Sequence, residues 1–203
     1  MGRAAAFSFY PGKNLGACGE GGAVTTNDES IARKVRMIRD HGQSRKYYHD
    51  LEGYNGRLDS IQAGILRVKL GHLAEWNEGR RRAATRYMEL LAPLKDSVTL
   101  PFRPAWSNSI YHLFVILTPD RDKLIEHFSA NGVGTGIHYP IPLHLQAPYS
   151  DLGYKKGDFP AAERVASQGL SLPMFPQLTI EQQRYVSEVI AEFVSLPASL
   201  SNA

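Results

Sequence analysis

The chain has 203 residues, of which 43% are hydrophobic and 21% charged, so its composition is that of a globular protein long enough to bury a core. The formal charge is only +3, with 23 basic residues interspersed among 20 acids, which argues against a nucleic-acid or membrane-surface role. The single cysteine, Cys18, excludes an internal disulfide and is expected to be a small, partly buried side chain. Because no leader and no apolar span of about twenty residues is present, we expect a cytoplasmic protein.

The first third of the chain predicts two strands and a helix. Residues 4–10 form a short apolar run, suited to a buried strand, that is stopped by Pro11-Gly12, and residues 22–26 indicate a second strand. Asn27 or Asp28 caps a helix that ends near His41-Gly42, where glycine suits a left-handed position. Residues 43–56 are polar and aromatic, which is typical of a surface loop with a function.

A long helix is predicted from about residue 58 to 91, with an apolar stripe expected in the core and Trp76 expected to pack. The rest of the chain favours a small α+β domain, in which Trp106 is also expected to pack. The expected strands are 97–100, 111–117 and 133–139, the expected helices are 120–131, 160–170 and 179–194, and the tail 195–203 is expected to fray.

A lysine follows the first strand directly, in the run FSFYPGKNLG at residues 7–16. A rigid turn would hold the Lys13 amine among apolar and aromatic neighbours, where partial loss of water leaves it free to attack a carbonyl carbon. Ser8 on the same strand could donate a hydrogen bond to a phosphate. Without further context, an exposed turn lysine is the commoner reading of this pattern.

The segment from Ser8 to Gly16 resembles the part of the DegT-type sugar aminotransferases that carries their Schiff-base lysine. These enzymes depend on pyridoxal 5'-phosphate (PLP) and have the aspartate-aminotransferase-like fold called fold type I. The resemblance covers nearly the whole chain and is strongest to the enzymes that aminate C3 of dTDP-linked 3-keto-6-deoxyhexoses. Its other segments are GGAV at 21–24, RDHG at 39–42, GYNGRLD at 53–59 with Gln62-Ala63, GTGIHYP at 134–140 and LSLPM at 170–174.

The resemblance implies the fold and the residues that hold the cofactor. The fold would be α/β: residues 1–78 would be the C-terminal part of the PLP-binding large domain, with the start of a long connecting helix, and residues 79–203 a small C-terminal α+β domain. Lys13 would bond to PLP and shuttle the proton, and Ser8 would bind its phosphate. Asn55 would reach the phosphate of the partner's cofactor in a homodimer with shared sites. The sequence alone favours Asn55 as a helix cap instead.

The resemblance also implies a reaction and its substrates. An amino acid, usually glutamate, would give its amino group to PLP, and a nucleotide-linked keto-deoxysugar would receive it, for amino-sugar, polysaccharide or antibiotic biosynthesis. His138 and Tyr139 match residues that contact the hexose, although a surface histidine is an equally good reading without the family. Lys46 and Tyr48 belong to the loop expected to hold the nucleotide or sugar, and Arg57 could meet a diphosphate oxygen. No metal site is expected.

Only the C-terminal portion of the family's chain is matched. The upstream half carries the helix N-terminus that receives the phosphate, the aromatic residue stacked on the ring and the Asp that protonates the pyridine nitrogen. We therefore expect a truncated or split product that is poorly active without a complementary piece. Two alternatives remain: a non-catalytic regulatory or structural relative, and a sugar dehydratase. Lys13 speaks against the first, because a binding module has no need of its amine, although the absent half speaks for it. Lys13 also speaks against the second, because the dehydrating relatives carry histidine at this position.

Overall fold

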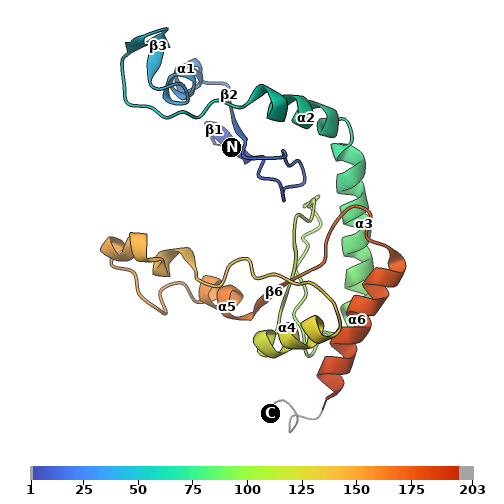
Figure 1. The fold of residues 1–203 in the computed structure, drawn as a ribbon. Coiled ribbons are helices and arrows are strands. Elements are labelled where there is room, and N and C mark those ends of the chain that lie inside the picture. The colour runs from blue at the N-terminus through green and yellow to red at the C-terminus, as the bar shows by residue number, and fades with distance from the viewer. Residues whose placement is uncertain (1, 197–203) are drawn as a thin grey trace. The chain divides into compact units, whose positions relative to one another are not determined.

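The computed structural model describes residues 2–196, and the chain divides between Glu75 and Trp76 into two compact units (Figure 1). The first unit contains a two-stranded antiparallel sheet. Strand β1 (Ala4–Ser8) pairs with β2 (Gly22–Thr26), from Ala4 opposite Thr26 to Ser8 opposite Gly22. Helix α1 (Glu29–Ile38) follows β2 and packs against it.

Helix α1 begins where the sequence predicts and ends at Ile38, a little before the predicted His41-Gly42. The Asp28 carboxylate accepts hydrogen bonds from the backbone N–H groups of Ser30 and Ile31, which makes it the N-cap. After the helix, His41 and Gly42 both have positive φ. A Cβ on Gly42 would lie only 1.6 Å from the Leu51 carbonyl oxygen, so glycine is required at this turn.

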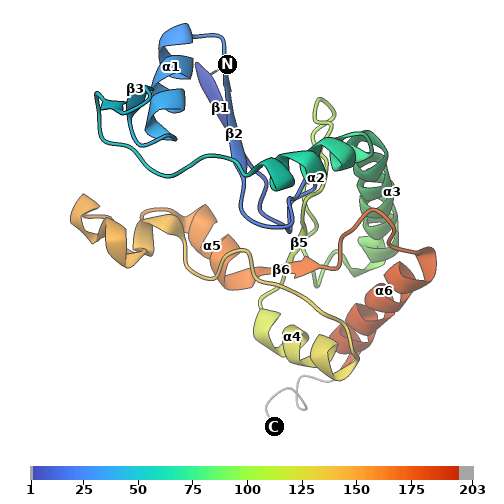
Figure 2. The ribbon, with the colours of Figure 1, turned by 45° about the horizontal axis from the view of Figure 1, so that its top comes forward.

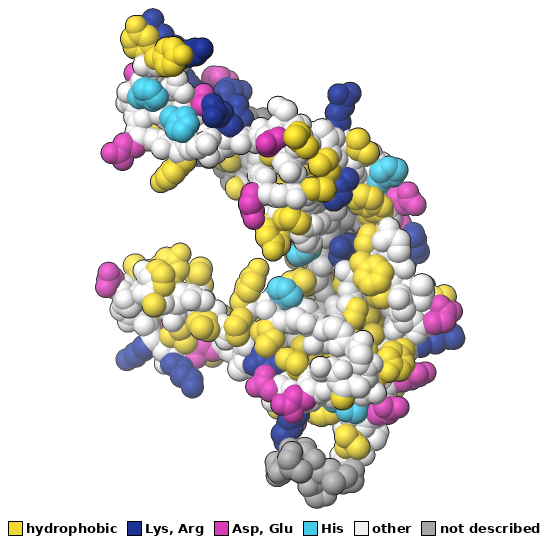
Figure 3. All heavy atoms as spheres, viewed as in Figure 1, with side chains coloured by type: hydrophobic (Ala, Val, Ile, Leu, Met, Phe, Trp, Pro, Cys, Tyr) yellow, Lys and Arg dark blue, Asp and Glu magenta, His cyan; other side chains and the backbone are white. Residues whose placement is uncertain are grey.

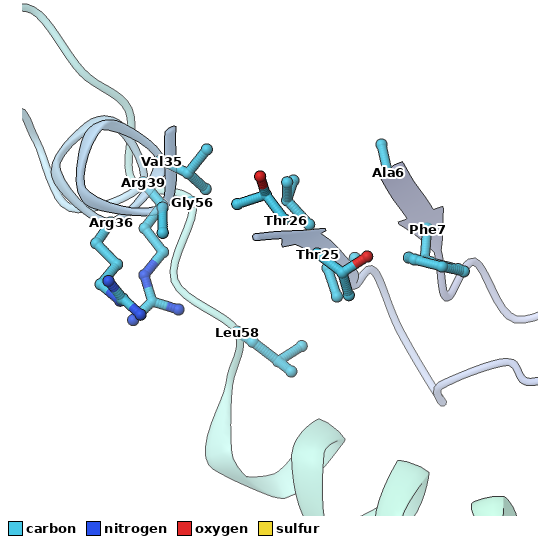
Figure 4. Close-up of a pocket in the computed structure, with 13 residues that line it drawn as sticks. Ala6, Phe7, Thr25, Thr26, Val35, Arg36, Arg39, Gly56 and Leu58 are labelled. Carbon is cyan, nitrogen blue, oxygen red and sulfur yellow. The ribbon is translucent and has the colours of Figure 1, made fainter. Parts of the chain in front are cut away.

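The prediction that β1 is buried is wrong. All five of its residues are exposed, because within residues 2–196 β1 has one neighbouring strand and residues of β1, β2 and α1 line an open hollow of about 750 Å³ (Figure 4). Phe7, Val35 and Leu58 are among the side chains that line this hollow. Of the apolar side chains in residues 2–75, only those of Ala17 and Leu66 are buried.

The predicted loop 43–56 lies at the surface, but it contains a short hairpin of β3 (Gln43–Arg45) and β4 (Tyr48–His49). The predicted long helix is two helices, α2 (Ser60–Leu70) and α3 (Leu73–Leu91), separated by Gly71-His72. The amides of these two residues donate to carbonyls three positions back, which ends the α-helical ladder. The expected apolar stripe is largely exposed on α2, where Ile61 and Val68 are about 70% accessible.

The second unit holds the hydrophobic core. Strand β5 (Phe114–Leu117) pairs antiparallel with β6 (Gly169–Leu172), and Figure 2 shows α4 (Arg121–Ala130) and α6 (Ile180–Ser195) close to this pair. The residues buried together come from α3, both strands and both helices: Tyr87, Leu91, Phe114, Ile116, Leu124, Phe128, Leu170, Leu172, Val186, Val189 and Ile190. The remaining helices are α5 (Pro160–Gln168) and the 3-10 turns η1 (Ala92–Leu94), η2 (Leu143–Leu145) and η3 (Ala147–Leu152).

Several predictions for this unit need correction. The expected strands at 97–100 and 133–139 contribute only isolated bridges, Thr99 to Leu117 and Gly136 to Ser171. Strand β6 was predicted in part as the end of a helix. Trp106, expected to pack, is 88% exposed. The helices at 120–131, 160–170 and 179–194 are confirmed to within two residues, and Thr179 caps α6 with a capping box. The predicted fraying concerns mainly residues 197–203, which lie outside the described part.

The segment around η2 and η3 carries apolar side chains at its surface (Figure 3). They form a hollow of about 390 Å³ lined by Leu143, His144, Tyr149, Leu152, Tyr154, Phe159 and Ala162. The segment is tied to α5 through Glu163, whose carboxylate accepts from the Gly157 N–H and lies 3.0 Å from His144 Nε2. These contacts, with the Gly157 amide first, lower the pKa of Glu163.

Candidate functional site

Lys13 lies in a closed loop that follows β1. Its backbone N–H donates to the Tyr10 carbonyl at 2.9 Å, and the Ala17 N–H donates to the Phe9 carbonyl at 2.8 Å. A Cβ on Gly16 would lie 2.2 Å from the Pro11 carbonyl oxygen, so only glycine allows the loop to close this tightly. The Lys69 ammonium donates to the Gly16 carbonyl from α2. Three hydrogen bonds therefore fix the backbone of the loop that carries Lys13.

The side chains of this loop fit a ligand with an aldehyde and a phosphate. Lys13 is half-buried, and no carboxylate in residues 2–196 forms an ion pair with its ammonium. Ser8 is exposed at the end of β1, and its hydroxyl oxygen accepts from the Tyr10 N–H at 3.3 Å, which leaves the hydroxyl hydrogen free to donate. Within the described residues, an amine without a carboxylate partner thus lies in the loop that directly follows β1, and a free hydroxyl donor lies at the end of that strand.

Asn55 is exposed and lies on a segment that pairs with the end of α1. It bridges Asp40, and the neighbouring Gly56 N–H donates to the Arg39 carbonyl at 2.8 Å. The reading of Asn55 as a helix cap is wrong, because Asp59 is the N-cap of α2 and accepts from the Ile61 N–H at 2.8 Å. The Asn55 side chain is therefore not used to begin the helix.

Lys46 from the β3–β4 hairpin and Arg57 from the segment before α2 reach one hollow of about 520 Å³, which is lined by Asp40, Gln43, Ser44, Arg45, Lys46, Tyr47 and Arg57. Arg57 lies 3.2 Å from the Asp40 carboxylate. The hollow is therefore lined by three cations and one carboxylate. A local excess of guanidinium and ammonium groups suits an oxyanion such as a diphosphate.

Two aromatic side chains accompany these cations. The Arg45 guanidinium lies 3.7 Å from the centre of the Tyr48 ring, and the Lys46 ammonium lies 5.1 Å from that of Tyr47. Contacts of this kind order long cationic side chains that would otherwise move freely. Sequence reasoning did not single out Arg45. Its spacing from Tyr48 across a two-residue turn was the available signal.

His138 and Tyr139 belong to the second unit and lie next to each other, with ring centres 5.6 Å apart and the planes near perpendicular. Both are exposed, and the peptide bond between them is cis. His138 Nδ1 lies 2.9 Å from the hydroxyl oxygen of Ser171 on β6. The other site residues, Ser8, Lys13, Lys46, Tyr48, Asn55 and Arg57, all belong to the first unit.

Among residues 2–196 no group of three or more His, Cys, Asp or Glu side chains is arranged to hold a metal ion. Cys18 is exposed rather than partly buried, and its backbone N–H donates to Gln62 Oε1 at 2.8 Å. Within the same described range, no helix has both the length and the apolar character needed to cross a bilayer.

Comparison with known proteins extends over almost the whole chain. The model of the DegT/DnrJ/EryC1/StrS aminotransferase family matches residues 1–191. A "pleiotropic regulatory protein" of Geobacillus stearothermophilus is 49% identical over 95% of this chain and 52% of its own length. The dTDP-3-amino-3,4,6-trideoxy-alpha-D-glucose transaminase of Streptomyces venezuelae is 43% identical over 93% of this chain and 50% of its own.

A solved structure agrees with these matches. The crystal structure of S. venezuelae DesV, described as a complex with a ketimine intermediate, superposes with a TM-score of 0.90 at 42% identity, covering 97% of this chain and 53% of that one. The chain spans about half the length of the curated relatives it matches. The resemblance inferred from the motifs is thus confirmed, and the chain belongs to the DegT/DnrJ/EryC1/StrS aminotransferase family.

Proposed function

We propose that this chain forms part of a PLP-dependent aminotransferase that transfers an amino group, from glutamate as the donor, to a nucleotide-linked keto-deoxysugar. Its family is one of PLP-dependent aminotransferases, and several relatives are named as transaminases of dTDP- or UDP-linked amino sugars. The observation that carries the proposal is the half-buried Lys13 on a tightly closed loop, with no ion pair to a carboxylate among residues 2–196. PLP supplies the electron sink that lets an amino group move between carbon skeletons.

Lys13 has two tasks in this proposal. When neutral, its Nζ is a nucleophile that can bond the cofactor aldehyde, and when charged it can return a proton to the carbon that receives the amino group. Both tasks require that no carboxylate holds the ammonium in place. The absence of such an ion pair in residues 2–196 supports this role.

The other site residues bind and orient. Ser8 donates its hydroxyl hydrogen to the cofactor phosphate. Asn55, whose side chain does not cap α2, reaches the phosphate of the partner's cofactor in a homodimer. Lys46 and Arg57 bind the diphosphate of the nucleotide, and Tyr48 holds Arg45 beside it. His138 and Tyr139 hydrogen-bond the hexose hydroxyls. In this assignment residues 1–78 are the PLP-binding part and residues 79–203 the small domain.

Chemical trapping tests the role of Lys13. The full chain is incubated with PLP and reduced with borohydride, and the peptides are then mapped by mass spectrometry. We expect a pyridoxyl group on Lys13, no such group in Lys13→Arg, and an unchanged Lys13 adduct in Lys34→Arg, which makes the same exchange on an exposed lysine of α1. A result in which Lys13 is unlabelled, or labelled no more than other lysines, contradicts cofactor binding by this chain.

A regulatory role is the second candidate, because a relative at 49% identity is named a pleiotropic regulatory protein. A regulatory protein that keeps the fold does not need the Lys13 amine. The same trapping experiment therefore separates the two candidates, since selective labelling of Lys13 favours the enzyme.

A further inference from the structure

The imidazole of His138 is held by a buried partner. Its Nδ1 lies 2.9 Å from the hydroxyl oxygen of Ser171, which is only 4% exposed. Ser171 is in the middle of β6, opposite Val115 in the β5–β6 ladder, and its backbone also exchanges two hydrogen bonds with Gly136, of 2.8 and 3.2 Å. The backbone that carries this hydroxyl group is therefore fixed by its pairing with β5 and Gly136.

The chain that follows β6 is anchored as well. The Tyr87 hydroxyl donates to the Pro173 carbonyl at 3.1 Å, and the Arg80 guanidinium donates to the Met174 carbonyl at 3.1 Å. Both donors come from α3, and both residues are buried. Ser171 therefore cannot follow a movement of His138, and the histidine must adapt to the serine.

Gly136 makes room for the ring. A Cβ at this position would lie 2.8 Å from His138 Cε1, closer than real Cβ contacts come. Any larger residue would push the ring away, and because the atom it meets is the far end of a side chain, the backbone would not have to move. The glycine thus allows the imidazole to reach the Ser171 hydroxyl.

The hydrogen bond also favours one ring nitrogen as the protonated one. Buried hydroxyl groups generally donate their hydrogen, and within residues 2–196 the Ser171 hydroxyl has His138 Nδ1 as its hydrogen-bond partner. When Nδ1 accepts this hydrogen bond, the proton of the neutral imidazole lies on Nε2. The nitrogen that faces away from Ser171 is then a donor.

We propose that Ser171 is a positioning residue that holds His138 in the Nε2–H form, so that the ring presents a hydrogen-bond donor to an oxygen atom of the bound sugar. Only the identity of the recipient, the sugar, depends on the proposed function above. The choice of tautomer follows from the contact of the Ser171 hydroxyl, for which Gly136 leaves room. An acceptor at this nitrogen would favour hydroxyl hydrogens, whereas a donor also recognises a ketone oxygen, which has no hydrogen to give.

Nitrogen NMR of the full chain tests the tautomer, because the chemical shifts of the two ring nitrogens show which one is protonated. The His138 signals are assigned by their loss in His138→Gln. We expect the Nε2–H form in the unmodified chain and a ratio of Nε2–H to Nδ1–H that falls about tenfold in Ser171→Ala, the effect of one ordinary hydrogen bond. Ser171→Thr keeps the hydroxyl and should retain the ratio.

Two control pairs separate positioning from general damage. Ser187→Ala removes another buried hydroxyl, which donates to the Gln183 carbonyl on α6, and should leave the His138 signals unchanged. Gly136→Ala should lower the ratio as Ser171→Ala does, whereas Gly134→Ala, where a Cβ meets nothing within 4 Å, should not. An Nδ1–H form in the unmodified chain, or an equal ratio in Ser171→Ala and Ser187→Ala, overturns the proposal.

Titration with dTDP-glucose tests the second half of the inference. Binding that shifts the His138 Nε2 signal supports the sugar as its recipient, and binding that leaves the signal unmoved refutes it. If no nucleotide sugar binds, the proposed function fails for this chain. That result leaves the tautomer measurement, which needs neither cofactor nor sugar, as an independent test.

Discussion

Helix α3 contains a glycine that packing requires and α2 contains one that packing does not. A Cβ on Gly79 would lie 2.6 Å from the Pro176 carbonyl oxygen and 3.2 Å from its Cα, all within the second unit. A Cβ on Gly64 would meet no heavy atom within 4 Å. Both residues lie inside helices, so the same exchange to alanine tests two opposite expectations.

The expected changes in the free energy of unfolding follow from helix propensity and from overpacking. Alanine is favoured over glycine inside a helix by roughly 1 kcal/mol, so Gly64→Ala should stabilise the chain by about that amount. At Gly79 the same gain is offset by overpacking against backbone, which costs roughly 1–3 kcal/mol. Gly79→Ala should therefore be less stable than Gly64→Ala by about 1–3 kcal/mol, the overpacking cost alone.

Urea unfolding followed by circular dichroism measures both variants, and intrinsic fluorescence of Trp76 and Trp106 reports on the second unit separately. We expect the transition midpoint to rise for Gly64→Ala and to fall relative to it for Gly79→Ala. Equal stabilisation of the two variants would refute the claim that α3 packs tightly on the segment carrying Pro176.

Three further changes test other contacts. Hydrogen bonds from the Ser30 hydroxyl, then from Arg3 and the Ile31 N–H, lower the pKa of Asp28 from 3.8 to about 2. Because the folded pKa lies below the unfolded one, the stabilisation of α1 by the ionised Asp28 carboxylate is complete above the unfolded pKa and is lost as the pH falls towards 2. Asp28→Asn should therefore make α1 helicity, measured by circular dichroism, less dependent on pH in this acid range. Tyr87→Phe leaves the Pro173 carbonyl without its donor and should lower the free energy of unfolding by roughly 1–2 kcal/mol in the same urea assay. An unchanged free energy of unfolding would show that this hydrogen bond does not stabilise the chain. Arg57→Gln should weaken dTDP binding, measured by calorimetry, by about tenfold, whereas Arg33→Gln on α1 should leave it unchanged. Equal affinities of the two variants would show that the hollow beside the β3–β4 hairpin does not bind the diphosphate.

Local signals in the sequence predicted local structure well. Asp28 and Thr179 cap the helices that they were expected to begin, since a side-chain oxygen three residues before a free amide is sufficient for a cap. Strand β6 was missed because its extended shape depends on β5, more than fifty residues earlier in the chain. Pairing of this kind leaves little trace in periodicity.

Burial was the least predictable property. The apolar stripe on α2 and the apolar run of β1 were read correctly as patterns, but a pattern shows which face is apolar and not whether anything covers it. The site residues came from the family resemblance. Their partners, such as Arg45 beside Tyr48 or Ser171 beside His138, depend on contacts that only the folded chain shows.

The uneven distribution of the core has a consequence for dynamics. Because residues 2–75 bury only the apolar side chains of Ala17 and Leu66, amide hydrogens on β1 and β2 should exchange with solvent deuterium far sooner than those of β5 and α6. Anything that binds at the Lys13 loop must then supply order that the first unit lacks, so slowed exchange there would report occupancy directly.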